Sequence, residues 1–453
     1  MADAMAESLN YASQKRRAVA SRSYRVKISP VNGQNFTAGQ TVNIDMPSNL
    51  AATYVNWNQC YLKFKVTADV DCTVDKAASC FISRVQSMTA GAQLYDCPSW
   101  NVLMNVLLDT DSGPGYKAGY GNLLMGTRGS DPAGEVIDAG ESRVFCVPFS
   151  LSSPFAMSTP HRLMPLSSSA PVQFKITLAS ITEAGYTTGT ISKLAFDEVE
   201  LVCVFTELSS AAEQQVQQMN GGQYNILANS WQAISTNMEN GATAVTANIG
   251  ISVSSLERVI VVHRPNKSAT VQAAFSQSNR ISNGLTEWQL LVNGEAFPQR
   301  AIKNEGKGAE IVAEYLLSDH SLVNFDKQSS FNVAIGLNGT TNYNGLDGAS
   351  VGLVPPSPFT IDFEDADGDV VGSNAAAGNI GSFFAGLELE TGLSDGRSQR
   401  LYSGISTIGS SVVYRGLYAG GTSTGPCEIT FFLGYTVMLS LNSRGTNVWS
   451  ISV

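Results

Sequence analysis

The chain alternates apolar and polar residues over short stretches from Tyr24 onward. In CYLKFKVTA, Leu62, Phe64 and Val66 share one face, and the more polar residues between them share the other. A period of two residues is typical of a β-strand that buries one side. The pattern therefore predicts a half-buried strand with a defined inner face.

Similar stretches recur through both halves of the chain, separated by segments rich in Gly, Asn and Ser. FISRVQSMTAGAQLYD predicts a hairpin that turns at Ala90-Gly91. The other strand candidates are YRVKI, TVNIDMP, SRVFCVPFSL, PVQFKITLAS, FDEVELVCVFTEL, AVTANIGIS, LERVIVVHRP, TEWQLLVNG, SSFNVAIGL, FTIDFE, SSVVYRGLYA and CEITFFLGYTVMLSL. About eight strands lie on each side of the midpoint, which favours an all-β protein of two sandwiches, for which eight-stranded double-sheet rolls are one construction.

Two segments depart from this pattern before the midpoint. CPSWNVLMNVLLD has helical spacing, and we expect a helix with Pro98 in its first turn and Asp96 or Cys97 at its cap. The glycine-rich residues 109–142 read as a long surface loop.

A polar helix is predicted at the midpoint of the chain. SSAAEQQVQQM begins with Ser209 or Ser210 as a possible cap and stops at Gly221-Gly222. Because strand-rich sequence lies on both sides, we interpret this helix as a joint between two like domains. The predicted divisions are an N-terminal basic arm at 1–23, a first roll at 24–208, a helical linker at 209–222 and a second roll at 223–453.

Composition fits this division of the 453 residues. Charged residues make up only 15% of the chain and hydrophobic residues 43%, so two cores can form under a weakly charged surface. The seven cysteines contain no CxxC pair, and we expect reduced, mostly buried thiols, with a metal site or a disulfide framework as the alternatives. The sequence lacks an apolar run of membrane-spanning length and a secretory signal, so we expect a soluble protein that is not exported by a cleaved signal.

The net charge of −10 argues against a protein that coats itself in nucleic acid. Residues 1–29 differ, with a local net charge of +4. This segment is either a solvated tail or an arm that docks on a neighbouring subunit or an acidic partner. The basic residues of the candidate interaction arm are Lys15, Arg16, Arg17, Arg22 and Arg25.

Catalytic and cofactor motifs are scarce. The three histidines are far apart in sequence, no P-loop is present, and Ser406 lacks the glycine spacing of a nucleophile elbow. The segment DFEDADGDV crowds five carboxylates, of which Asp365, Asp367 and Asp369 form a weak candidate cation loop. Its spacing does not match an EF-hand, and a solvated acidic loop is the simpler interpretation. We therefore expect no enzyme activity and no cofactor.

The order of segments resembles the double-jelly-roll major capsid proteins of tailless icosahedral DNA viruses, most closely the polinton-like virus, adintovirus and virophage branch. The resemblance rests on about seven strings in order, and EWQLLVNGEAFPQ is the most specific because of its glycine turn and proline. Others are SPVNGQNFTAGQTVNIDMP, NQCYLKFKVTA, RVFCVPFSLSSPFAMSTPHRLMPL, LVCVFTELSSAAEQQVQQMNGG, SSLERVIVVHRP and QRLYSGIS.

This resemblance implies a structural virion protein that forms homotrimers with a pseudo-hexagonal outline. Such capsomers would tile an icosahedral shell around a DNA genome, assembled in the host cytoplasm or nucleus. It further implies contacts with neighbouring capsomers, with minor capsid and penton proteins and, through the N-terminal arm, with an inner membrane or the genome.

Two other function classes remain open at this point. A cellular or secreted double β-sandwich could bind glycans in a lectin-like manner through loop aromatics such as Tyr116 and Tyr120. A glycan-active enzyme would need paired carboxylates in a groove, for which the acidic segment 362–369 is the candidate.

Overall fold

The computed structural model shows a molecule built mainly of β-strands, with short helices between them and one helix at the midpoint of the chain. The described residues are 21–112, 114–127, 133–158, 161–167, 169–186, 191–239, 241–265, 277, 280, 283–304, 309–318, 362–364, 370–373, 383–390, 404–419, 427–442 and 447–453.

The first half of the chain folds into two facing sheets with a small sheet at one end. One large sheet contains β1 (Ser21–Ile28), β13 (Leu194–Leu208), β4 (Thr53–Ala68) and β9 (Ser142–Pro148), with β2 (Phe36–Thr37) and β10 (Met164–Pro165) at its margins. The other contains β3 (Thr41–Asp45), β11 (Val172–Leu178), β6 (Ile82–Thr89) and β7 (Ala92–Pro98). The small sheet contains β12 (Gly185–Tyr186), β5 (Cys72–Asp75) and β8 (Ala133–Ile137).

The second half repeats this construction. Its first sheet contains β14 (Gln223–Met238), β23 (Cys427–Asn442), β16 (Leu256–Pro265) and β21 (Ala385–Glu388), with the C-terminal β24 (Trp449–Ser452) paired to β23. Its second sheet contains β15 (Ala244–Ile249), β22 (Val412–Tyr418), β17 (Leu285–Val292) and β18 (Glu295–Lys303). A separate hairpin joins β19 (Asp362–Glu364) and β20 (Val370–Ser373).

Strand order identifies each half as a jelly roll. When the eight main described strands of each half are numbered along the chain, the two sheets read 1-8-3-6 and 2-7-4-5 in both halves. Interlocked antiparallel order of this kind defines the eight-stranded roll. The expected fold class, two consecutive jelly rolls, is therefore confirmed.

Alternation along β4 appears in the structure as the sequence predicts. Leu62, Phe64 and Val66 are buried, and the residues between them are partly exposed. The predicted hairpin forms between β6 and β7, where Ala90 and Gly91 both have positive φ angles, 44° and 84°. Positive φ at both central residues matches the right-handed twist of the strands that the turn connects.

Two expectations about the helical part of the first roll are wrong. The helix α1 (Trp100–Asp111) starts after Ser99, which adopts a left-handed conformation, because Pro98 still belongs to β7. Residues 109–142 are not a loop: they contain α2 (Pro114–Tyr116), η4 (Lys117–Gly121), α3 (Asn122–Met125) and β8. Glycine here permits close packing rather than an open loop, since a Cβ on Gly121 would lie 2.6 Å from Thr127 Oγ1.

The midpoint helix α5 (Ser210–Asn220) forms where its sequence predicts. The Ser209 hydroxyl accepts the backbone N–H of Ala212 at 3.3 Å, and Gly221 ends the helix in the left-handed region. The remaining described helices are η3 (Ala78–Phe81), α4 (Ile181–Ala184) and α6 (Ala309–Ser318).

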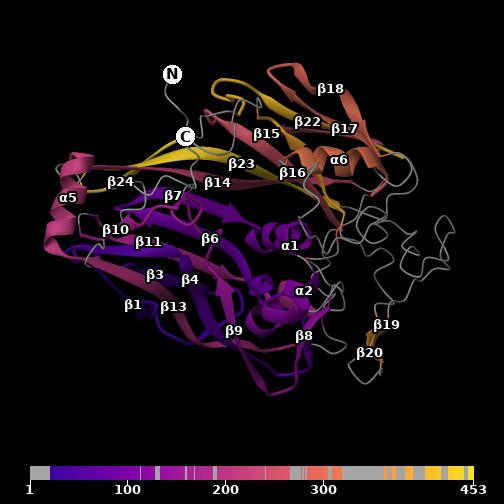
Figure 1. The fold of residues 1–453 in the computed structure, drawn as a ribbon. Coiled ribbons are helices and arrows are strands. Elements are labelled where there is room, and N and C mark those ends of the chain that lie inside the picture. Colours follow the sequence, from indigo (N-terminus) through magenta and orange to yellow (C-terminus); the bar gives the residue numbers. More distant parts are fainter. Residues whose placement is uncertain are drawn as a thin grey trace, which may run out of the picture.

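The two rolls pack against one another along their length (Figure 1). The sheet of β14, β23 and β16 is buried on both faces: Phe431 and Leu433 belong to the core of the second roll, whereas Phe432 belongs to a core shared with the first roll. Across the junction, the rings of Phe155 and Trp449 lie 4.9 Å apart. Figure 1 places α5 at one end of this double layer and α1 and α2 at the other.

Candidate functional site

Catalytic groups do not converge in the described part of the chain. No group of three or more His, Cys, Asp or Glu residues there could hold a metal ion. His161 is exposed, and His263 is buried with its Nε2 2.8 Å from the Tyr418 hydroxyl, while His320 lies outside the described residues. All seven cysteines are free and six are buried, so the thiols are mostly buried as expected.

The candidate cation loop lies outside the part of the chain that the structure describes. Asp365, Asp367 and Asp369 lie outside the described residues, and of Asp362 and Glu364 only the backbone in β19 is described. The candidate cation loop therefore stays a prediction.

The candidate interaction arm divides at Ser21. Lys15, Arg16 and Arg17 lie outside the described residues. Arg22 and Arg25 are exposed on β1, which pairs with β13 over its full length, and Arg22 forms a 2.7 Å ion pair with Glu207. These two arginines thus belong to the sheet rather than to a free segment, although their side chains remain accessible.

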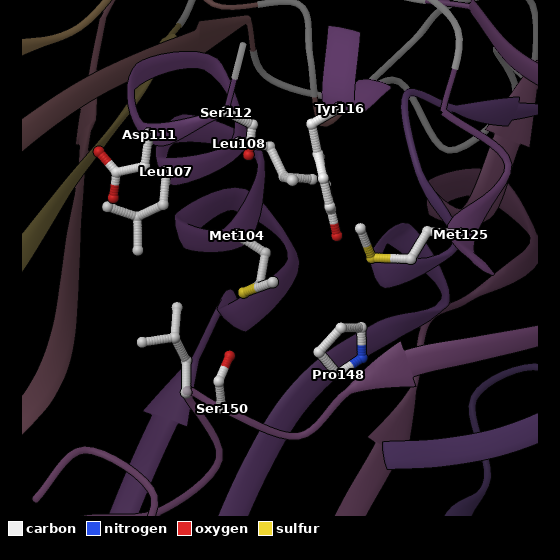
Figure 2. Close-up of a pocket in the computed structure, with 10 residues that line it drawn as sticks. Met104, Leu107, Leu108, Asp111, Ser112, Tyr116, Met125, Pro148 and Ser150 are labelled. Carbon is white, nitrogen blue, oxygen red and sulfur yellow. The ribbon is translucent and has the colours of Figure 1, made fainter. Parts of the chain in front are cut away.

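A cavity of about 480 Å³ opens between α1 and the end of β9. Figure 2 shows Met104, Leu107 and Leu108 of α1 on one side and Tyr116 and Met125 on the other. Asp111, Ser112 and Ser150 supply the polar groups of the lining. With its apolar floor and without a paired acid and base, the cavity is suited to receive an apolar side chain rather than to perform chemistry.

Large apolar side chains are exposed next to this cavity. Tyr120 and Leu123 are 76% and 73% exposed, and Leu124 and Tyr116 are more than one-third exposed. We call these four residues the α2–α3 surface. Several large apolar side chains exposed within one short segment are a feature of contact surfaces between proteins. The sequence marked Tyr116 and Tyr120 as loop aromatics, whereas the structure places them on short helices beside a cavity.

A buried ionic cluster joins the two rolls, and the sequence analysis missed it. Asp109 of α1 forms ion pairs with Lys76, Lys117 and Arg280, and the Lys117 Nζ lies 3.0 Å from its carboxylate. Burial raises the pKa of Asp109, but the three cations lower it more, so the carboxyl group stays ionised. Lys117 is eight residues from Asp109, but Lys76 and Arg280 are far from both in sequence, so neither spacing nor a local charge pattern could have revealed the cluster.

No helix in the described part of the chain combines the length and apolar character needed to cross a bilayer.

Comparison with known proteins gives a match in structure and none in sequence. The sequence matches no family model and no curated protein. The structure is similar to the PBCV-1 virus capsid protein, with 11% identity over 97% of this chain and 98% of that one, at a TM-score of 0.59. It is also similar to PBCV-1 VP54 fitted into a reconstruction of the virophage Sputnik, with 11% identity, the same two coverages and a TM-score of 0.57.

The major capsid protein of mavirus is a third match. It shares 10% identity with this chain over 99% of this chain and 95% of the mavirus protein, at a TM-score of 0.52. Each match spans nearly the whole length of both proteins, so the likeness covers both rolls and their connection. The chain therefore has the double-jelly-roll fold of these viral capsid proteins.

Proposed function

We propose that the protein is the structural major capsid protein of an icosahedral virus and not an enzyme. The observation that supports this most is the two-roll fold, which matches capsid proteins over 97% or more of this chain. The described part of the chain adds the cavity beside α1 and the exposed α2–α3 surface, but no group suited to catalysis. A protein of this kind works through the surfaces that it presents.

We propose a homotrimer as the assembling unit. Three copies would place six jelly rolls around a threefold axis and give a pseudo-hexagonal capsomer. Heterologous contacts that close on themselves give such a ring. Obligate interfaces of about 2,000–5,000 Å² are more apolar than the remaining surface, and a chain with 15% charged residues can supply them.

The proposal extends to the surroundings of the capsomer. Neighbouring capsomers, minor capsid proteins and penton proteins would contact it in a virion shell that encloses a DNA genome. Assembly would take place in the host cytoplasm or nucleus. The segment that precedes β1 would act as an arm towards a neighbouring capsomer, an inner membrane or the genome, because its one lysine and two arginines oppose the acidic charge of the remaining chain.

The mass of the purified protein in solution tests the central claim. Multi-angle light scattering should give about 144 kDa, three times the chain mass of 48.1 kDa. Negative-stain images of the same sample should show hexagonal outlines or closed shells. A stable monomer that forms neither under any assembly condition would contradict the proposal, and binding to a glycan array would then favour the lectin-like alternative.

A further inference from the structure

Three cations are buried around the carboxylate of Asp109 where the rolls meet. Lys76 follows β5, Lys117 lies in η4 and Arg280 comes from the second roll, and all three pair with Asp109. Their side chains are 6%, 1% and 0% exposed. Water therefore cannot screen these charges, and each must be balanced within the protein.

Asp75, which precedes Lys76 in the chain, is also fully buried. Its Oδ2 accepts the backbone N–H of Gln277, three residues before Arg280, at 2.6 Å. Even when Asp75 is counted with the cluster as an ionised group, the described side chains there hold three positive charges and two negative ones. An excess of one buried positive charge is costly unless a counter-ion or the loss of a proton removes it.

Lys76, next to Asp75 in the chain, is affected by the same excess of positive charge. Burial, together with repulsion from Lys117 and Arg280, lowers the pKa of Lys76 to about 7 despite its pairing with Asp109. The carboxylate of Asp109 alone does not neutralise the cluster.

Arg280 carries donors that the described part of the chain leaves unused. Its Nη2 donates to Asp109 Oδ2, whereas its Nε and Nη1 have no hydrogen-bond partner there. A fully buried guanidinium with unmatched N–H groups is rare, because each unmatched donor loses its hydration without replacement.

We propose that one small monovalent anion of the halide class, with chloride as its ordinary form, is bound at the roll junction against Arg280. A chloride ion supplies one negative charge and accepts N–H donors from any direction, which matches both the charge excess and the unused donors. A phosphate would bring more negative charge than the cluster can balance. The anion would link residue 280 of the second roll to α1 of the first, whatever the protein's function.

Crystals grown with sodium bromide in place of sodium chloride test the site directly. We expect an anomalous difference peak from bromide in contact with Nε or Nη1 of Arg280. A water molecule or a carboxylate of the chain in that position, without a bromide peak, would overturn the proposal.

Thermal unfolding tests the same site in solution. At pH 6 and constant ionic strength, the wild-type Tm should rise with the logarithm of chloride concentration when chloride replaces gluconate, since a ligand of the folded state alone stabilises it in this way. Lys76→Met removes the excess charge and leaves Asp109 paired with Lys117 and Arg280, so most of the chloride dependence should disappear.

A matched control is Arg84→Met, which removes a partly exposed ion pair with Asp96 that shares no residue with the cluster. This variant should keep the full chloride dependence. A wild-type Tm that does not respond to chloride would refute the proposal, as would a folded Lys76→Met variant that responds like wild type. The bromide experiment uses the wild-type protein and decides the question even if Lys76→Met does not fold.

Discussion

Phe64 illustrates how single side chains hold the first roll together. It is fully buried on β4, and its ring lies within 6.2 Å of the rings of Phe81, Phe145 and Phe196. These neighbours come from three other parts of the roll, so one aromatic group links β4 to η3, β9 and β13. Aromatic clusters of this kind contribute beyond the area that they bury.

Replacing this ring should be severely destabilising. Phe64→Ala removes a buried aromatic group and leaves a cavity, and we expect a loss of about 3–5 kcal/mol in the free energy of unfolding. Lys65→Ala, on the partly exposed face of the same strand, serves as the control and should change stability by less than about 0.5 kcal/mol. Urea unfolding at matched protein concentration measures both, and equal midpoints for the two variants would contradict the assignment of Phe64 to the core.

His263 makes the stability of the second roll depend on pH. Burial lowers the pKa of His263 to about 3, from 6.5 in the unfolded chain, so the folded protein keeps this ring neutral. The contribution of the neutral His263 ring to the free energy of unfolding is complete above pH 6.5. It declines as the pH falls towards 3, because only the unfolded state takes up the proton. The decline is about 1.4 kcal/mol per pH unit, or about 2 kcal/mol by pH 5.

His263→Gln removes this titration and can keep a hydrogen bond to Tyr418. The difference in unfolding free energy between wild type and variant should be constant above pH 6.5 and should shift against wild type below it. His161→Gln changes an exposed side chain and should follow the wild-type profile. A constant difference from pH 7.5 to pH 5 would show that His263 is accessible to protons in the folded state.

At the scale of elements, α5 depends on its two ends. It begins at the hydroxyl of Ser209 and ends at Gly221, whose φ of 61° no other residue type adopts as easily. Inside the helix, Glu213 is buried and accepts the Tyr54 hydroxyl at 2.7 Å, which fixes the helix against the first roll. The helix is polar in sequence, yet it is anchored by a specific contact.

Gly221→Ala should destabilise this element by about 1 kcal/mol, since an L-residue in the left-handed region costs about that much. No atom lies within 4 Å of the added Cβ, so the effect isolates the backbone conformation. Gly250→Ala is the matched control, because it also meets open space but lacks the positive φ. Equal thermal midpoints for the two alanine variants would show that the end of α5 relaxes without cost.

Most strands could be predicted from sequence because each has one solvent-facing side, and α5 could be predicted from its caps. Where both faces are buried, alternation disappears: β16 contains the apolar run VIVV and β23 the run FFLGY. Helix α6 was not predicted. It is held by a residue far away in sequence, because the Tyr315 hydroxyl donates a 3.0 Å hydrogen bond to Thr110. The ionic cluster around Asp109 and the cavity in Figure 2 likewise exist only after the chain has folded.

At the scale of the whole molecule, the two rolls behave as one unit. They share a core that includes Phe155 and Trp449, and the buried cluster around Asp109 crosses the same junction. An interface of this kind holds the rolls in a fixed relative orientation, which a capsomer with a pseudo-hexagonal outline would require.

The N-terminal segment before β1 can be removed without changing the two packed rolls, so its role in assembly can be tested by itself. Because β1 starts at Ser21 and pairs with β13 from that residue onward, deletion of residues 1–20 should leave both rolls intact. We expect the truncated protein to keep the trimer mass and the wild-type Tm but to assemble shells less efficiently, since Lys15, Arg16 and Arg17 are lost.

The comparison variant replaces these three residues with Ala in the full-length chain and should show the same defect if charge is the cause. Light scattering at increasing ionic strength measures assembly, and the advantage of wild type should shrink as salt screens the arm. Shell formation by the truncated protein at the wild-type rate would rule out a role for the arm and leave assembly to surfaces of the folded rolls.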